Sequence, residues 1–360
     1  MNLIRRELDR LTGRGTAAVT VPPMDGALKP NQHLEEAEAL AAPAPDNLTV
    51  NGGQVLYTSG REIRALASGK PIHVCERTIT CLAAGPGGVL AIGLAGLGIR
   101  MLSPDGTLRA AGGARIRNAT AAMFRGADLI VCEGSARHSP EHWQRDLMET
   151  GPADGGSGSV WICAADGSER RLGAGLRYPY GVLAGQDGGI VISESWSHRL
   201  LALDPNGSAP ARRLVADLPG YPARMAPAAD GACWLAVFAP RSQLIEFVLR
   251  EDSFRRRMMA QIEPDYWISP ALASGRSFLE PLQGGAVKQM GILKPWAPSR
   301  SYGLVIKLDS AWNPVLSLHS RADGRRHGTT SVLEAEGQLF VASKGGDAIL
   351  KLPAGDLPKT

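Results

Sequence analysis

Five polar residues of this chain have types and positions that suit chemistry at one shared place. They are Asp46, Asn118, Tyr180, Arg224 and His327, and each falls six to ten residues before the start of one of a series of similar apolar segments. An aspartate or a histidine can act as a general base, and an arginine with a tyrosine can stabilise an oxyanion. We therefore predict Asp46 or His327 as the base, and Arg224 with Tyr180 as the oxyanion-stabilising pair.

The guanidinium of Arg224 also suits a carboxylate or a phosphate, which favours a small anionic ligand. Asn118, Tyr180, Arg224, Glu194 and Thr330 are the predicted substrate-binding residues. A structural alternative remains open, in which Tyr180 and Arg224 simply fill the centre of the fold. Glu194 likewise has a structural alternative, a hydrogen bond within the scaffold.

Six apolar segments must position these residues. Each segment starts at a glycine turn, continues as an alternating apolar run and ends in Gly, Ser, Ala or an aromatic residue, which is typical of a buried strand. They recur at roughly the spacing of four-stranded propeller blades. The segments are GGQVLYTSG from Gly52, GGVLAIGLAG from Gly87, GADLIVCEGS from Gly126, GGIVISESW from Gly188, GACWLAVFA from Gly231 and GQLFVASKG from Gly337. The sequence predicts an all-β, six-bladed propeller.

Two regions depart from this repeat. Residues 1–43 are predicted as an N-terminal helical extension, with helices over Asn2–Leu11 and Leu34–Ala42, and residues 44–360 as a single propeller domain. The interval before the sixth segment is about twice a normal blade. We assign it to a helix-containing insertion at about 243–300, before the last blade, rather than to a seventh blade. The insertion is also the place where an oligomer interface is expected, if there is one.

Composition and charge disfavour some classes of partner. The formal net charge of +4 over 360 residues is small, so a nucleic-acid surface is disfavoured. The charged N-terminus lacks a signal-peptide core, and no stretch is apolar for long enough to span a bilayer, so we expect a cytoplasmic protein with a small-molecule ligand and no membrane partner. Five cysteines without CxxC spacing predict buried free thiols.

The stretch RYPYGVLAGQDGGIVISESWSHRLLALDPNG, followed by ADLPGYPARMAPAADGACWLAVFAPR, resembles the central block of the strictosidine synthase-like propellers. It is also similar to the wider superfamily of gluconolactonase, regucalcin and paraoxonase. The resemblance extends from about Asp46 to Leu352 and implies the same six-bladed fold. It says less about chemistry, because one fold hosts many functions.

In the metal-dependent members, the resemblance implies a calcium ion held by a Glu, two Asn and an Asp at the mouth of the channel. Asp46 and Asn118 stand at two of these positions, whereas Tyr180, Ala223 and Arg224 replace the oxygen ligands of the others. The glutamate that the strictosidine synthases use in the last blade also has no counterpart here. We therefore expect no cofactor and no metal, with calcium as a disfavoured alternative.

These observations favour a propeller that acts on a small anionic organic molecule at the channel mouth, by hydrolysis of an ester or lactone without calcium. Two alternatives stay open. One is a non-catalytic propeller that binds a small anion or a protein partner, and the other is a calcium-dependent lactonase with a degenerate site. If the protein is an enzyme, the sequence indicates a hydrolase, and literal strictosidine synthase activity is not expected.

Overall fold

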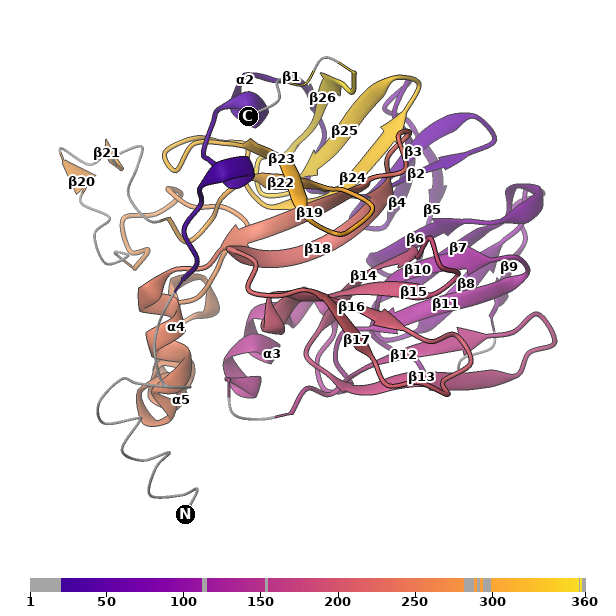
Figure 1. Cartoon of the computed structure of the whole chain (residues 1–360), viewed down its shortest axis with the longest axis horizontal. Coiled ribbons are helices and arrows are strands. Elements are labelled where there is room, and N and C mark those ends of the chain that lie inside the picture. The colour runs from indigo at the N-terminus through magenta and orange to yellow at the C-terminus, as the bar shows by residue number, and fades with distance from the viewer. Residues whose placement is uncertain are drawn as a thin grey trace.

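Six four-stranded antiparallel sheets are arranged around a central axis in the computed structural model of the chain (Figure 1). The structure describes residues 21–111, 115–152, 155–281, 288–289, 292–293, 299–355 and 357. The innermost strand of each sheet contacts the innermost strands of the two neighbouring sheets, and β24 contacts β2, so the ring is closed. The predicted six-bladed propeller is confirmed.

The blades follow one another along the chain. Blade one contains β2 (Pro45–Asn51), β3 (Gln54–Ser59), β4 (Glu62–Ala65) and β5 (Pro71–Val74). Blade two contains β6 (Ile79–Ala84), β7 (Leu90–Leu94), β8 (Gly98–Leu102) and β9 (Leu108–Ala110). Blade three contains β10 (Ala119–Arg125), β11 (Asp128–Glu133), β12 (Gly158–Cys163) and β13 (Glu169–Leu176). Blade four contains β14 (Pro179–Ala184), β15 (Ile190–Glu194), β16 (Arg199–Leu203) and β17 (Arg212–Val215). Blade five contains β18 (Gly220–Pro227), β19 (Cys233–Pro240), β22 (Leu304–Leu308) and β23 (Pro314–His319). Blade six contains β24 (Thr329–Ala335), β25 (Gln338–Ser343), β26 (Ala348–Pro353) and β1 (Glu38–Ala41).

The glycine that starts each apolar segment has a conformational reason. Each lies in the turn between the first and second strands of its blade and has a positive φ, between 57° at Gly52 and 82° at Gly231. Glycine adopts this left-handed backbone without a steric penalty, and hairpin turns require it. The six segments are therefore the second strands of the six blades, as the repeat predicted.

The N-terminal strand β1 closes the ring, because it pairs with β26 and so supplies the outer strand of blade six. The predicted helix over Leu34–Ala42 is therefore wrong for its second half. Only α2 (His33–Glu36) is helical, and Glu38–Ala41 is extended because it finds a free sheet edge in blade six. The short 3-10 turn η2 (Gly26–Leu28) precedes α2. The predicted helix over Asn2–Leu11 lies outside the described residues.

The insertion lies inside blade five, between its second and third strands, and precedes the last blade as predicted. It is helix-containing, as predicted, and begins with two helices, α4 (Gln243–Arg250) and α5 (Asp252–Gln261). They are followed by the 3-10 turn η6 (Pro264–Tyr266) and the short strands β20 (Lys288–Gln289) and β21 (Ile292–Leu293). Blade three also carries a helix, α3 (Trp143–Thr150), which follows the 3-10 turn η4 (Pro140–His142). The remaining 3-10 turns are η3 (Pro86–Gly88) and η5 (Ser195–Ser197). Figure 1 shows α3, α4 and α5 together beside the blades.

The hydrophobic core is divided among the blade interfaces. One cluster, for example, joins Leu56 and Ile63 of blade one to Ile92 of blade two, and another joins Ile130 of blade three to Ile192 of blade four. All five cysteines are buried and free, as predicted, and burial raises the pKa of the Cys132 thiol. Within the described ranges, no helix has the length and apolar character needed to cross a bilayer.

The close approach of blades four and five gives a prediction about packing at the channel. A Cβ atom at Gly181 would lie 2.4 Å from the backbone oxygen of Ala223, so Gly181→Ala forces the two inner strands apart. We expect it to lower the free energy of unfolding by about 1–3 kcal/mol, measured by urea denaturation. Gly155→Ala is the matched control, because no atom lies within 4 Å of its added Cβ. Equal stability of the two variants would contradict this packing.

Candidate functional site

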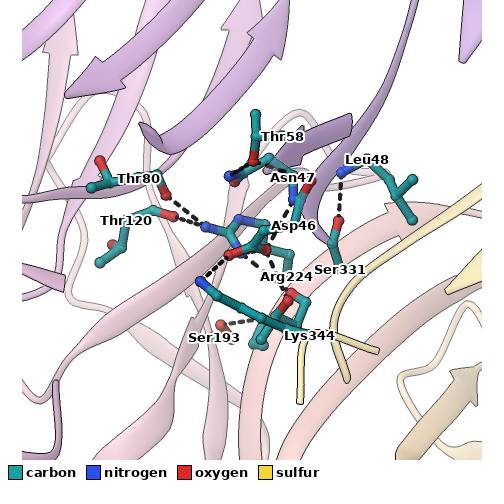
Figure 2. Close-up of polar contacts among 12 residues, drawn as sticks. Asp46, Asn47, Leu48, Thr58, Thr80, Thr120, Ser193, Arg224, Ser331 and Lys344 are labelled. Carbon is teal, nitrogen blue, oxygen red and sulfur yellow. Dashed lines mark hydrogen bonds and ion pairs between the residues drawn. The ribbon is translucent and has the colours of Figure 1, made fainter. Parts of the chain in front are cut away.

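The inner strands bring one arginine to the centre of the channel. Arg224 belongs to β18, and its guanidinium donates from Nη2 to the backbone oxygens of Thr80 (2.8 Å) and Thr120 (2.8 Å). From Nη1 it donates to Asp46 Oδ1 (2.6 Å) and to the backbone oxygen of Thr330 (3.4 Å). These acceptors lie on blades one, two, three and six, so a single side chain from blade five links five of the six blades (Figure 2).

The remaining blade contributes an aromatic ring. The guanidinium carbon of Arg224 lies 4.8 Å from the ring centroid of Tyr180 on β14, within the range of a cation–π interaction. Tyr180 makes edge contacts with Tyr178 and Phe238, at centroid distances of 5.6 and 5.7 Å. Burial raises the pKa of the Tyr180 hydroxyl, so the phenol stays protonated near neutral pH. All six blades therefore contact Arg224.

Asp46 is the anionic partner of this arginine. Besides Arg224, its Oδ1 accepts hydrogen bonds from the Thr330 hydroxyl (2.8 Å) and the Asn47 amide (2.9 Å), and its Oδ2 accepts one from Lys344 Nζ (3.0 Å). Burial alone would raise the pKa of this carboxyl, but the charges of Arg224 and Lys344 and the hydrogen bonds lower it to about 2. Asp46 is thus an ionised, fully engaged carboxylate rather than a base poised near neutral pH. We call Asp46, Tyr180, Arg224, Thr330 and Lys344 the central cluster.

His327, the other predicted base, has both ring nitrogens engaged elsewhere. Nδ1 is 2.7 Å from the Ser301 hydroxyl, and Nε2 is 2.7 Å from the backbone oxygen of Arg321, to which it donates. Burial lowers the pKa of this imidazole, so it is neutral near neutral pH. The described contacts of His327 connect the end of the insertion to the turn before β24 and include none with Asp46.

Asn118 and Glu194 are also held by the scaffold. Asn118 donates from Nδ2 to the backbone oxygen of Ser135 (2.9 Å). Glu194 accepts from the backbone amide of Arg177 (2.6 Å) and pairs with Arg199. Glu133 occupies the matching position in blade three and accepts from the Arg117 amide (3.0 Å). The two glutamates thus fasten the turns that lead into β10 and β14, and neither belongs to the central cluster.

Two cavities lie on either side of the central cluster. One, of about 460 Å³, is bordered by Lys344, by α3 and by the insertion. The other, of about 260 Å³, is bordered by Arg224 and by apolar side chains of the inner strands, such as Leu82 and Val332. Because Lys344 borders the first cavity and Arg224 the second, the chain from Lys344 through Asp46 to Arg224 separates them. We call the 460 Å³ space the mouth cavity.

Lys344 was missed at the sequence level, although it lies in the last apolar segment, GQLFVASKG. It directly follows β25, whose end pairs with the start of β24, so it emerges at the same end of the blade as Thr330. A charged residue at this end of a second strand was the available signal. Thr80 and Thr120 contribute only backbone oxygens here, which residue types do not reveal.

The residues at the channel centre do not fit a calcium ion. Calcium takes six to eight oxygen ligands. The oxygens of Asp46 already accept from two cationic side chains, and the charge of Arg224, which lies over the Tyr180 ring, would repel a cation beside them. Across the described ranges, no group of three or more His, Cys, Asp and Glu residues could hold a metal.

The comparisons with known proteins show the fold. No protein-family model matches the sequence, and no curated protein matches it. Among solved structures, a gluconolactonase of Xanthomonas campestris is 14% identical with a TM-score of 0.54, over 89% of this chain and 91% of that chain. The calcium-binding regucalcin of Agrobacterium tumefaciens is 14% identical with a TM-score of 0.52 (92% and 95%), and a luciferin-regenerating enzyme is 13% identical with a TM-score of 0.51 (91% and 96%). The predicted resemblance to the gluconolactonase and regucalcin propellers is thus confirmed for the fold.

The burial of the central pair gives a prediction about stability. Arg224→Met removes four hydrogen bonds and leaves Asp46 buried with Lys344 as its remaining cationic partner. Breaking a buried pair from one side is strongly destabilising, so we expect a loss of about 3–5 kcal/mol in the free energy of unfolding, measured in urea. The control is Arg212→Met, whose pair with Asp187 is exposed and should change stability by less than about 1 kcal/mol. Similar losses in both variants would contradict a central role for Arg224.

The low pKa of Asp46 predicts how stability depends on pH. Because the folded-state pKa of about 2 lies below the ordinary value of 3.8, this carboxylate stabilises the fold above about pH 4. That stabilisation is lost as the pH falls towards 2. Between pH 5 and pH 2, the native protein should lose about 2 kcal/mol more stability than Asp46→Asn, measured as the free energy of unfolding at each pH. The contributions of the other acid-sensitive groups cancel in this comparison. Parallel curves for the two proteins would contradict the assignment.

Proposed function

We propose that the protein binds a small organic anion in the mouth cavity and that it does so without a metal ion. The observation that carries this proposal is Lys344, a cation that borders the cavity while its ammonium is paired with Asp46 at the channel centre. The neighbouring Arg224 has both Nη groups committed to the scaffold and is 9% exposed, so Lys344 is the member of this pair of cations that can meet a ligand.

Charge at the centre favours an anion. Asp46, Arg224 and Lys344 together carry one negative and two positive charges, because the carboxylate is ionised and both cations keep raised pKa values. An ammonium has three donors. One N–H group of Lys344 donates to Asp46. The side chain is 32% exposed, which leaves its other N–H groups for a ligand in the cavity.

Among the described residues that border the cavity, two of the three acidic ones have partners of their own. Asp347 accepts from the Ala44 amide (2.9 Å) and lies 3.8 Å from Arg276. Glu280 accepts from the backbone amides of three residues, 275 to 277, at 2.8 to 3.2 Å. Hydrogen-bonded and paired carboxylates repel an entering anion less than free ones do, so the charge of Lys344 is only partly offset.

The cavity has the size and the walls of a small-molecule site. Its volume of about 460 Å³ lies in the range of ligand pockets, which combine apolar and aromatic walls with a few polar groups. Here Trp143 of α3 and Tyr266 of the insertion supply aromatic surface. A sugar acid or another hydroxylated carboxylate matches this mixture of cationic, polar and aromatic groups.

Hydrolysis of an ester or lactone is the second candidate, favoured by the gluconolactonase among the fold neighbours. In this candidate Lys344 polarises the carbonyl and stabilises the oxyanion. The carboxylate of Asp46 and both ring nitrogens of His327 are hydrogen-bonded within the protein, which does not support either residue as the base. Asp265 is the acidic residue on the cavity wall whose carboxylate has no hydrogen bond in the described part of the chain, so it is the base to test.

Replacing Lys344 tests the proposed binding. We expect gluconate, but not glucose, to raise the melting temperature of the full chain in EDTA, and Lys344→Met to weaken gluconate binding about tenfold in calorimetric titration. The methionine keeps the length of the side chain and removes the ammonium. Lys351→Met is the matched control, because this lysine lies on β26 and pairs with Glu38 of the outer strand.

Three outcomes would contradict the proposal. They are the absence of binding by gluconate and phosphate, equal affinities of Lys344→Met and the native protein, or a rise in melting temperature that requires calcium. Acid release from a lactone, corrected for spontaneous hydrolysis, is the added readout for the second candidate. Activity in EDTA that Lys344→Met and Asp265→Asn both abolish would favour hydrolysis over binding alone.

A further inference from the structure

A second cation borders the mouth cavity, and it is more deeply buried than Lys344. Arg300 lies at the end of the insertion, before β22, and is 4% exposed. Its Nη1 donates to the backbone oxygen of Asp265 (2.7 Å), whereas Nε is buried without a hydrogen-bond partner. In the described part of the chain, no hydrogen bond is formed by Nη2 either. One edge of the guanidinium is therefore uncommitted.

Comparison with the other buried arginines shows what Arg300 lacks. Arg224 lies 2.6 Å from Asp46, and Arg255 lies 2.7 Å from Asp252. Within the described ranges, no carboxylate lies within 4.0 Å of Arg300. Burial lowers the pKa of this guanidinium, against a smaller opposing effect of the carboxylates of Glu280 and Asp265. A buried charge without a partner is costly, so the folded protein holds this cation at a cost in stability.

The sequence immediately before Arg300 contains no acidic residue. Residues 281–299 contain no Asp or Glu, and their charged residues are Lys288 and Lys294. Glu280, at the start of this stretch, has its carboxylate oxygens bonded to backbone amides. This stretch of the sequence therefore carries a net positive charge.

The backbone at Arg300 is held in place on both sides. Its carbonyl accepts from the Ala271 amide (2.8 Å). The Ser301 hydroxyl lies 2.7 Å from Ser274 Oγ and 2.7 Å from His327 Nδ1. His327, which the sequence suggested as a base, thus fixes the segment that carries Arg300. A guanidinium fixed in this way is preorganised, which reduces the entropy lost when a ligand binds.

We propose that Arg300 is the carboxylate-recognising residue of the mouth cavity and that its Nε–Nη2 edge pairs with a ligand carboxylate. This inference rests on the proposed function, because it assigns the ligand class of the same cavity. Two parallel N–H groups match the two oxygens of a carboxylate, whereas Lys344 offers a point charge without that geometry. Arg300 therefore adds a paired contact to a carboxylate, and Lys344 adds general attraction for anions.

The test compares Arg300→Met with the native full chain, using gluconate and inorganic phosphate as separate probes at matched ionic strength. We expect Arg300→Met to weaken gluconate binding at least tenfold, and Arg300→Lys to restore only part of the loss because a lysine cannot form the paired contact. Phosphate can accept the same paired contact, so Arg300→Met should weaken phosphate binding as well, and Arg300→Lys should again restore only part of the loss. An unchanged gluconate affinity, or full restoration by Arg300→Lys, would overturn the assignment.

The ligand-free melting temperature provides a readout that does not depend on binding. Because Arg300 is an unpaired buried charge, Arg300→Met should melt no more than about 2 °C below the native protein. Arg241→Met is the control, since it leaves the largely buried Glu246 without its arginine and should melt about 5 °C lower or more. If Arg300→Met falls as far as the control, Arg300 is a structural anchor and the inference fails.

The two proposals fail in distinguishable ways. If Lys344→Met loses gluconate binding and Arg300→Met keeps it, the proposed function stands and the role of Arg300 is refuted. If the native protein binds neither gluconate nor phosphate, the proposed function fails and the inference fails with it.

Discussion

The pairing of Arg224 with Asp46 is the contact on which the rest of the structure depends. A propeller channel is a place where six strand starts converge, and the backbone oxygens there need donors. Arg224 supplies N–H groups to Thr80, Thr120 and Thr330, and Asp46 neutralises the charge that this requires. Because the pair is buried and each of its polar atoms except Arg224 Nε is hydrogen-bonded, its attraction can offset much of the cost of desolvation. The ring is thus joined at its centre by a side chain.

This arrangement commits the charged groups at the channel centre to the scaffold, so we place the proposed ligand site in the mouth cavity. With its Nη groups committed, Arg224 has little capacity left for an oxyanion, and Asp46 with a pKa of about 2 cannot act as a base near neutral pH. Lys344 and Arg300 border the mouth cavity instead, together with the exposed Arg276. In the function that we propose, the insertion in blade five contributes to the ligand site, since it carries Arg300 and forms much of the cavity wall.

The sequence predicted the ring better than it predicted the site. The six glycine-led segments identified the second strands, because hairpin twist demands a positive φ at one place in every blade. Counting back from them located Asp46 and Tyr180 at the starts of inner strands, whereas Arg224 lies in the middle of β18. Residues 38–41 were misassigned to a helix because their partner, β26, lies more than 300 residues away in the chain. The partners of Arg224 are mostly backbone oxygens, and a pattern of residue types does not show them.

The most direct test of the account is a double-mutant cycle between Asp46 and Arg224, measured by urea unfolding of the native protein, Asp46→Asn, Arg224→Met and the double variant. If the two side chains form the central fastening of the ring, their coupling free energy should be about 2–3 kcal/mol, at the upper end for neighbouring residues. A coupling below about 0.5 kcal/mol, as found for independent sites, would contradict the account.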